Sequence, residues 1–181
     1  GIDELRAAAA QDMGARRGMM FAPDEIVVGA GAKPFIAYTI ASVTDYGVED
    51  EVIYPVPGFP IYESQIVANG AVPVPIYLRE SRDFAFDPDE LDAAITPRTR
   101  LLATSHVLWT TGRRLDLHRL KRESGLAVLV AGAQSAGALE VDIGELGFYT
   151  VPAQKWLCGP APPGALLLRD PGLVRLNAPH V

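Results

Sequence analysis

The chain has 181 residues, of which 49% are hydrophobic and 21% charged, and its formal net charge is −6. This length suits one well-buried core and is too short for two full-sized domains. The acidic balance argues against a nucleic-acid-binding protein, because no excess of basic residues can neutralise phosphates. No apolar run approaches the roughly 18 residues that a membrane-spanning helix needs, and no signal peptide is visible. We therefore expect a soluble globular domain with no membrane partner.

Cysteine usage suggests a cellular setting. Cys158 is the single cysteine of the chain, which excludes a disulfide within it. Such usage suits a reducing compartment. We therefore expect a cytoplasmic protein, and we predict no metal site.

The first half of the chain alternates between helical and strand-like segments. Residues 2–17 carry apolar side chains close to helical spacing, with alanines between them, which favours a helix. Short β-branched runs indicate buried strands, and longer periodic segments indicate helices. The sequence predicts strands at residues 26–28, 51–54, 72–78 and 100–104, helices at about 34–43 and 61–69, and a short helical connection at 84–92.

A glycine-rich turn joins the first of these strands to the next helix. It contains Gly29, Gly31 and Lys33. Free N–H groups and the helix dipole both point at such a turn, so it predicts an anion site. A dinucleotide-binding turn is a second interpretation, but its third glycine would fall at Pro34, which leaves that motif incomplete. A turn that binds no ligand is the third.

The second half sets one lysine between two strands. The pattern predicts a helix at about 116–124 and strands at 127–130, 148–151 and 165–168. Lys155 follows the middle one of these strands, so its amine is expected at a strand end, where desolvation can make it nucleophilic. An ordinary surface lysine is the alternative. A lone histidine after a strand is more often structural than catalytic, and His106 is therefore left out of the catalytic set.

Two segments of the first half resemble the class I aminotransferases. They are PDEIVVGAGAKPF at residues 23–35 and DEVIYPVPGFPIYES at residues 50–64. The resemblance implies that Gly31, Ala32 and Lys33 hold the phosphate of pyridoxal 5'-phosphate. It also implies that Phe59 stacks on the pyridine ring, and Tyr62 matches a neighbouring tyrosine of the family. This resemblance is continuous to about residue 104.

From residue 105 onward the chain resembles the class V aminotransferases and cysteine desulfurases, which share fold type I of the pyridoxal-phosphate enzymes. The matching segments are AGAQS at residues 131–135 and QKW at residues 154–156. The resemblance implies that Lys155 forms the Schiff base, that Gln134 sits beside the phenolic oxygen of the cofactor and that Gln154 lies near its phosphate. Ala131 departs from the family, which has there an aspartate that keeps the pyridine nitrogen protonated.

The resemblance also implies a fold. It is an α/β fold of three layers, α/β/α, around a mainly parallel seven-stranded sheet of order 3-2-4-5-6-7-1, with strand 7 antiparallel. Residues 1–181 would form a single large, cofactor-binding domain, with the N-terminal arm and the C-terminal small domain of the family absent. Sites of this fold are built at a dimer interface, so a homodimer is expected.

The function that this combination favours is a pyridoxal-phosphate-dependent, aminotransferase-like enzyme. Its partner would be a small amino acid or oxo acid, and the loss of the aspartate suggests a weak or inactive enzyme. A non-catalytic domain that keeps the fold, with or without the cofactor, is the alternative. A nicotinamide-binding oxidoreductase is a further one, which Pro34 disfavours.

Overall fold

One mixed sheet of seven strands organises the computed structural model, which describes residues 2–15 and 20–174. The order is β1-β7-β6-β5-β4-β2-β3. β7 runs antiparallel to both of its neighbours, whereas β2 to β6 pair in parallel. The predicted strand order and the antiparallel strand 7 are confirmed. The strands are β1 Ile26–Ala30, β2 Glu51–Val56, β3 Val72–Tyr77, β4 Thr99–Ser105, β5 Ala127–Ala131, β6 Gly147–Pro152 and β7 Pro163–Leu168.

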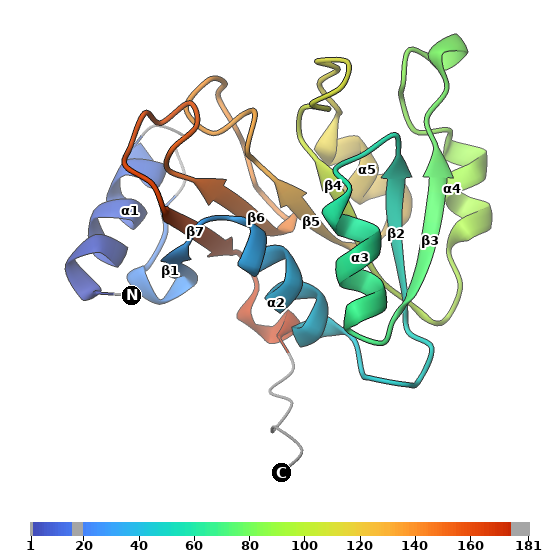
Figure 1. The fold of residues 1–181 in the computed structure, drawn as a ribbon, viewed down its shortest axis with the longest axis horizontal. Coiled ribbons are helices and arrows are strands. Elements are labelled where there is room, and N and C mark those ends of the chain that lie inside the picture. The colour runs from blue at the N-terminus through green and yellow to red at the C-terminus, as the bar shows by residue number, and fades with distance from the viewer. Residues whose placement is uncertain (1, 16–19, 175–181) are drawn as a thin grey trace.

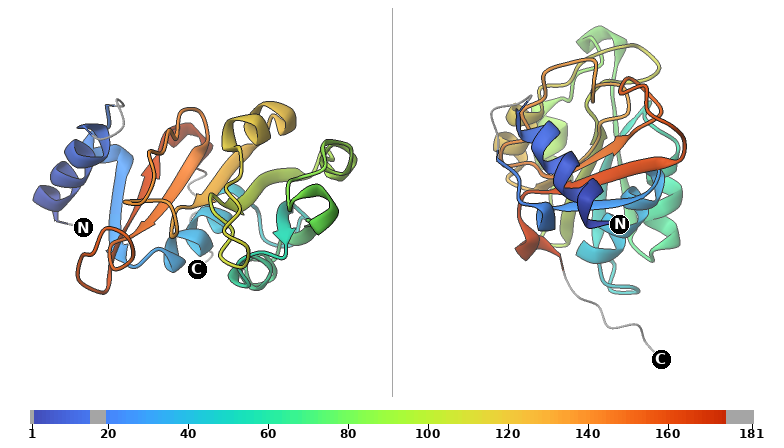
Figure 2. Two further views of the ribbon diagram at one scale, coloured as in Figure 1. Left: turned by 90° about the horizontal axis from the view of Figure 1, so that it is seen from above. Right: turned by 90° about the vertical axis from the view of Figure 1, so that its left-hand side faces the viewer.

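Helices cover both faces of this sheet, as the three-layer prediction requires. α2 (Lys33–Val43) and α3 (Ile61–Ala68) lie in front of the sheet in Figure 1, and α5 (Leu117–Ser124) lies behind it. α1 (Asp3–Ala15) and α4 (Pro88–Ala94) pack into the same core cluster as α5, and Figure 2 shows the layers from two further sides. Within the described residues, every helix is too short or too polar to cross a bilayer.

The central strands contribute side chains to two separate hydrophobic cores, one on each face of the sheet. In β4, Leu101 and Ala103 belong to the cluster beneath α2 and α3, whereas Leu102 belongs to the cluster on the opposite face. All three side chains are fully buried. A parallel strand covered on both faces must be apolar at successive positions, which explains the continuous apolar runs in the sequence.

One part of the sheet is covered by an irregular segment and not by a helix. Between β5 and β6, residues 132–146 form turns and one isolated bridge, and Val141, Ile143 and Leu146 from this segment are buried in the same cluster as α5. This segment therefore replaces a helix over β5 and β6, and it leaves room beside α5.

The free edge at β3 is protected by prolines. Val72 and Leu78 donate their N–H groups toward β2 and its flank, so the alternate positions Pro73 and Pro75 face outward. Proline has no N–H group, and an edge strand that lacks outward donors is a poor template for further pairing.

Several element boundaries differ from the prediction. The helix expected at 84–92 begins at Pro88, because the Asp87 side chain accepts a hydrogen bond from the Asp89 N–H at 3.1 Å and caps the helix there. β5 extends to Ala131, and β6 begins already at Gly147. The first predicted helix corresponds to α1, and residues 16 and 17 lie outside the described residues.

Candidate functional site

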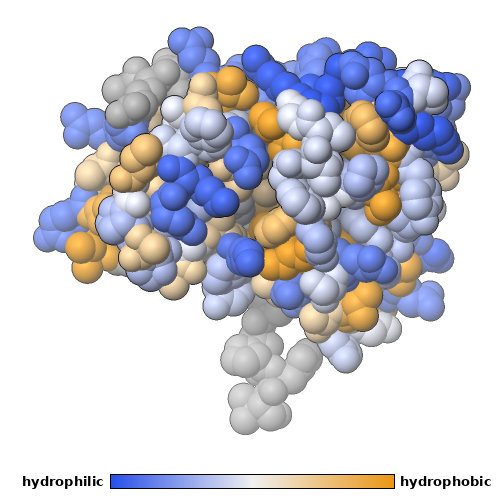
Figure 3. Space-filling model, turned by 45° about the horizontal axis from the view of Figure 1, so that its top comes forward, coloured by the Kyte–Doolittle hydropathy of each residue, from blue (hydrophilic) through white to orange (hydrophobic). Residues whose placement is uncertain are grey.

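A cavity of about 660 Å³ opens at the carboxyl ends of β4, β5 and β6, beside the turn between β1 and α2. Figure 3 shows this side of the molecule, where hydrophobic surface lies between hydrophilic side chains. We call the cavity the lysine pocket. All seven residues that the sequence suggested for binding or catalysis line it: Gly31, Ala32, Lys33, Phe59, Gln134, Gln154 and Lys155.

The floor of the lysine pocket is made of small side chains from three neighbouring strands. Ser105 is the register partner of Ala131, and Ala131 is the partner of Thr150. Ala131 is 5% exposed and lines the pocket. No aspartate or glutamate is found among the lining residues that the structure describes. A ligand ring above this floor therefore meets no acidic group.

The turn between β1 and α2 forms one wall of the pocket. Gly31 has φ +82°, a left-handed conformation that favours glycine, and its N–H donates to the Gly29 carbonyl at 3.1 Å. Gly164 of β7 packs against this turn so closely that a Cβ there would lie 2.5 Å from the Gly31 carbonyl carbon. α2 begins at Lys33, so the turn ends at a helix N-terminus, where the first N–H groups have no partner within the helix and Pro34 has no N–H group to offer.

Aromatic rings form the opposite wall. Phe59 lies under the Lys33 ammonium, with Nζ 5.9 Å from the ring centroid. Trp109 also lines the pocket, and its Nε1–H donates to the Gly58 carbonyl at 3.2 Å. The loop before α3 is thereby tied to the segment after β4.

Tyr62 supports this wall from behind. It is fully buried, it packs edge-on against Phe59 with ring centroids 6.1 Å apart, and it does not line the pocket. Its hydroxyl lies 2.9 Å from the Ser105 hydroxyl. Burial raises the pKa of the Tyr62 hydroxyl far above its ordinary value. Tyr62 therefore holds Phe59 and Ser105 in place as a neutral group.

Lys155 and Gln154 lie in a turn just beyond the end of β6, at the pocket rim. Both residues are exposed. The sequence predicts an amine at a strand end and not on a solvated face. Lys155 does follow the end of β6, but it is exposed, because the chain leaves the sheet at Pro152 and turns before it reaches the lysine. A solvent-facing amine at the rim is open to an entering ligand.

Gln134 is oriented by a tryptophan that sequence reasoning did not select. The Trp156 Nε1–H donates to Gln134 Oε1 at 3.0 Å, and the amide –NH₂ of Gln134 makes no hydrogen bond to any residue that the structure describes. The turn that carries Gln134 rests on Tyr149. A Cβ at Gly132 would lie 2.3 Å from the Tyr149 ring, and the Ser135 and Tyr149 hydroxyls are 2.7 Å apart. Gly132 and Ser135 thus position the turn.

Three more polar or aromatic residues that line the pocket were missed in the sequence. Ser105 and Thr150 lie at the carboxyl ends of predicted strands, and Trp109 follows one of them. Residues near the carboxyl ends of parallel strands gather at one edge of a sheet, and this rule could have identified them.

His106 follows Ser105 in the chain but lines a different cavity. In the part of the chain that the structure describes, no three histidine, cysteine, aspartate or glutamate residues are grouped to hold a metal ion.

Two family models match this chain. The model described as aminotransferase class I and II matches residues 1–122, and the model described as aminotransferase class-V matches residues 69–180. Each covers more than half of the sequence. The two matches overlap at residues 69–122, so the predicted switch near residue 105 falls inside a segment that both families share.

Individual proteins with similar sequences are also aminotransferases. The aspartate/prephenate aminotransferase of Cereibacter sphaeroides is 32% identical over 100 residues, which cover 55% of this chain and 24% of that protein. The aspartate aminotransferase of Geobacillus stearothermophilus is 31% identical over 121 residues, which cover 67% of this chain and 30% of that protein. This chain thus matches less than a third of the length of either relative.

A solved structure with the same fold is a double mutant of Thermus thermophilus aspartate aminotransferase. It superposes with a TM-score of 0.81 at 23% identity, over 93% of this chain and 47% of that one. A mutant of C-DES with glycine covalently linked to its PLP cofactor superposes with a TM-score of 0.80 at 22% identity, over 97% of this chain and 48% of that one. At these identities the likeness shows the fold, and this chain spans about half of each structure.

Proposed function

The chain belongs to the aminotransferases, and from this premise we propose that it binds pyridoxal phosphate in the lysine pocket through Lys155. It would act as an aminotransferase-like enzyme on an amino acid or an oxo acid. The observation that carries this proposal is the convergence of all seven suggested residues on one cavity, although they come from distant parts of the chain.

The charges around the pocket suit a phosphate group. Lys33 and Lys155 line it, and no acidic residue does so within the described part of the chain. The turn at Gly31 leads into the N-terminus of α2, whose free N–H groups and dipole favour an anion. Gly31, Ala32 and Lys33 would hold the phosphate, and Gln154 lies on the same rim.

The walls of the pocket suit a flat ring. Phe59 offers a ring face that Tyr62 holds from behind, and Trp109 extends the aromatic surface. The amide –NH₂ of Gln134, fixed by Trp156, is free to donate to an oxygen on such a ring.

Pyridoxal phosphate, when bound, supplies an aldehyde for an amine to capture and a ring that accepts electron density from the α-carbon of an amino acid. Lys155 supplies the amine, and after release the same amine is placed to carry a proton to and from a bound amino acid. The aromatic wall excludes water from one side of the ligand.

Two features limit the chemistry and favour a second candidate function. Ala131 lies where a carboxylate would keep the ring nitrogen protonated, and no arginine lines the described pocket to bind a substrate carboxylate. A domain that binds the cofactor without catalysing transamination is therefore the alternative proposal.

Covalent labelling tests the proposal. The protein is mixed with pyridoxal phosphate and reduced with borohydride, and the modified peptide is identified by mass spectrometry. We expect the label on Lys155 and its loss in Lys155→Ala. Lys33→Ala is the matched control, because Lys33 lines the same pocket, and this variant should keep the label on Lys155 while binding the cofactor more weakly. A label on Lys33 or Lys121 in the unmodified chain would contradict the assignment.

A ligand panel separates the candidate functions. A ligand that binds the native state at about 100 times its dissociation constant stabilises it by roughly 2.7 kcal/mol. We expect pyridoxal phosphate, and not NAD, to raise the melting temperature. A change in the absorbance of the bound cofactor after addition of an amino acid favours the enzyme, and no change favours the non-catalytic domain.

We also propose that residues 1–181 form one large, cofactor-binding domain that assembles as a homodimer in the cytoplasm. Light scattering tests the assembly, and a monomer at tens of micromolar, roughly a working concentration for moderate affinities, would contradict it.

A further inference from the structure

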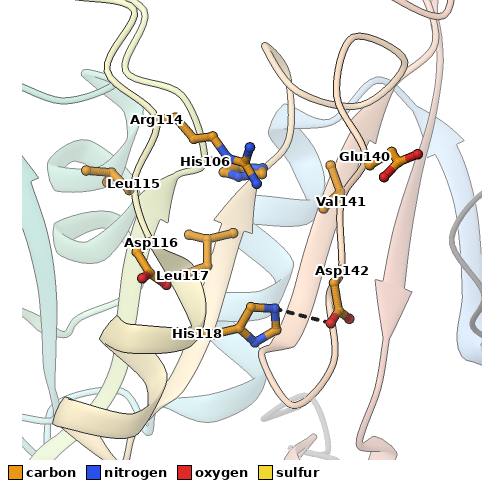
Figure 4. A pocket seen from close by; sticks show the side chains of 9 residues that line it. All are labelled: His106, Arg114, Leu115, Asp116, Leu117, His118, Glu140, Val141 and Asp142. Carbon is orange, nitrogen blue, oxygen red and sulfur yellow. Dashed lines mark ion pairs between the residues drawn. The ribbon is translucent and has the colours of Figure 1, made fainter.

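A second cavity, of about 820 Å³, lies on the other face of the sheet (Figure 4). Leu117 and Val141 in its lining belong to one core cluster, whereas the lysine pocket takes Ile36 and Ala131 from the other cluster. The cavity lies between the start of α5 and residues 140–142 of the irregular segment that covers β5 and β6. We call it the histidine cavity, and the proposed cofactor chemistry does not use it.

His106 is a buried polar side chain without a partner in this cavity. The residue is 4% exposed, and its Nδ1 atom is buried without a hydrogen bond. Burial, followed by the positive charges of Arg114 and His118, lowers the pKa of His106 to about 4. The neutral ring therefore has one N–H donor to offer. Buried polar atoms without partners are uncommon in native proteins and call for an explanation such as a ligand.

Arg114 is an exposed residue that lines the same cavity. Figure 4 shows its side chain reaching across to His106. Its neighbour Arg113 forms an ion pair with Asp83, but Arg114 has neither an ion pair nor a side-chain hydrogen bond in the described residues. A guanidinium carries five N–H donors in a planar fork that matches a carboxylate.

Two of the three acidic residues of the histidine cavity accept hydrogen bonds, and the third points away from Arg114. Asp116 accepts from the Arg119 N–H at 2.9 Å as the cap of α5. Asp142 accepts from the Gly144 N–H at 2.8 Å and faces His118 Nε2 at 3.4 Å. Figure 4 shows the Glu140 carboxylate pointing away from Arg114.

Apart from the Glu140 carboxylate, which points away from Arg114, the groups left open in the described part of this cavity are donors. They are the Arg114 guanidinium, the His106 ring and the N–H groups in the first turn of α5. Among the side-chain hydrogen bonds of the described residues, a single one engages this turn, from the Arg119 N–H to Asp116. Donors of this kind bind an anion. Because three carboxylates line the same cavity, each added negative charge on a ligand increases the repulsion. The cavity should therefore prefer a singly charged anion.

We propose that the histidine cavity is a binding site for a small monocarboxylate, held by the Arg114 fork and the His106 ring at the start of α5. The apolar side chains of Leu115, Leu117 and Val141 would contact the rest of the ligand. The site lies apart from Lys155 and does not depend on the cofactor.

Nuclear magnetic resonance tests the site on the 181-residue chain. Isotope-labelled protein at pH 7 is titrated with acetate, with phosphate and with chloride at matched ionic strength. We expect acetate to give saturable shifts of the His106 ring and of the Leu117 and His118 amides, with a dissociation constant of roughly 1–10 mM. Phosphate should bind at least threefold more weakly, and chloride should give only small linear shifts. An acetate methyl contact with Leu117 or Val141 gives a second readout without any mutation.

Substitutions then test whether Arg114 binds the carboxylate of the ligand. Arg114→Gln should weaken acetate at least tenfold, and Arg114→Lys should weaken it less. Arg122→Gln, on the exposed side of α5, is the control and should leave the affinity unchanged. Lys155→Ala should also bind acetate normally. The proposal is overturned by linear shifts equal to those of chloride, by tighter binding of phosphate, or by an unchanged affinity in Arg114→Gln with a native spectrum.

Discussion

Polar side chains have hydrogen-bond partners at the amino ends of the parallel strands, whereas several at the carboxyl ends do not. At the amino end of β2, the buried Asp50 accepts from the Asp45 N–H at 2.8 Å and from Arg100 Nε at 2.7 Å. Glu51, also buried, accepts from Thr96 and from Arg98 at 2.5 and 2.6 Å. Each carboxylate thus has at least two hydrogen-bond partners.

At the carboxyl ends, polar groups are left open. Lys155 is exposed at the rim of one cavity, and Arg114 and His106 lack hydrogen-bond partners for their side chains in the other within the described residues. Ala131 leaves the floor of the lysine pocket without charge. Fully bonded polar groups stabilise a fold, whereas open ones cost stability and remain available to ligands. The amino ends of the strands thus carry polar groups that stabilise the fold, whereas the carboxyl ends carry polar groups that are open to a ligand.

Ala131→Asp gives the largest expected effect, because it adds a charge to the open end. We expect the variant to be less stable without ligand, since the new carboxylate is buried and unpaired. With pyridoxal phosphate, a carboxylate beside the ring nitrogen should accelerate single-turnover reaction with an amino acid by about a hundredfold to a thousandfold. Ala131→Asn is the control of similar shape without charge. Equal rates for both variants would show that this position does not act on the ring.

His106, just beyond the carboxyl end of β4, should make the stability of the fold depend on pH. Its pKa is lowered to about 4 in the folded chain, so between pH 6.5 and about 4 the unfolded state binds more protons, and stability falls as pH falls. The full difference corresponds to roughly 3 kcal/mol. We expect His106→Gln to lose this part of the acid sensitivity in urea unfolding at pH 7.5 and pH 4. A parallel decline of both proteins would refute the assignment.

Glu51 tests whether the hydrogen-bonded carboxylates at the amino end of β2 stabilise the fold. Burial raises its pKa, but hydrogen bonds from Thr96 and Arg98 outweigh this effect, so the pKa of Glu51 is lowered. Its contribution is therefore present above the unfolded pKa and is lost as pH falls through the lowered value. We expect Glu51→Gln to reduce the free energy of unfolding by roughly 2 kcal/mol at pH 7, because Arg98 is half exposed and water weakens this pair. The exposed Glu145→Gln should change it by less than about 0.5 kcal/mol.

Trp156→Phe gives the smallest expected effect. The variant keeps an aromatic ring but loses the N–H that holds Gln134 Oε1, so the Gln134 amide can rotate. We expect cofactor affinity to fall about fivefold, corresponding to roughly 1 kcal/mol. Trp109→Phe loses a bond to a backbone carbonyl and reorients no side chain, so its effect should be smaller. A larger effect for Trp109→Phe would show that the aromatic wall matters more than the orientation of Gln134.

Much of the fold follows from local pattern. The β-branched runs, the glycine turn at Gly31 and the short apolar strand before Lys155 predict strands and turns within a few residues of their observed bounds. The family resemblance then supplied the strand order, and the same resemblance named seven residues that lie around one cavity. Local pattern succeeds here because strand period and turn chemistry depend on near neighbours in sequence.

The sequence by itself determined which segments are strands and which side chains stand near strand ends, since these properties depend on the chain's own period. Tertiary structure alone decided which polar groups find partners. Glu51 meets Arg98 across 47 positions of sequence, and Trp156 meets Gln134 across 22. Tyr62 turns into the core. Arg113 pairs with Asp83, whereas Arg114 beside it has no ion pair among the residues that the structure describes. Such pairings depend on register and packing between distant elements, where a shift of one residue moves a side chain to the other face of the sheet.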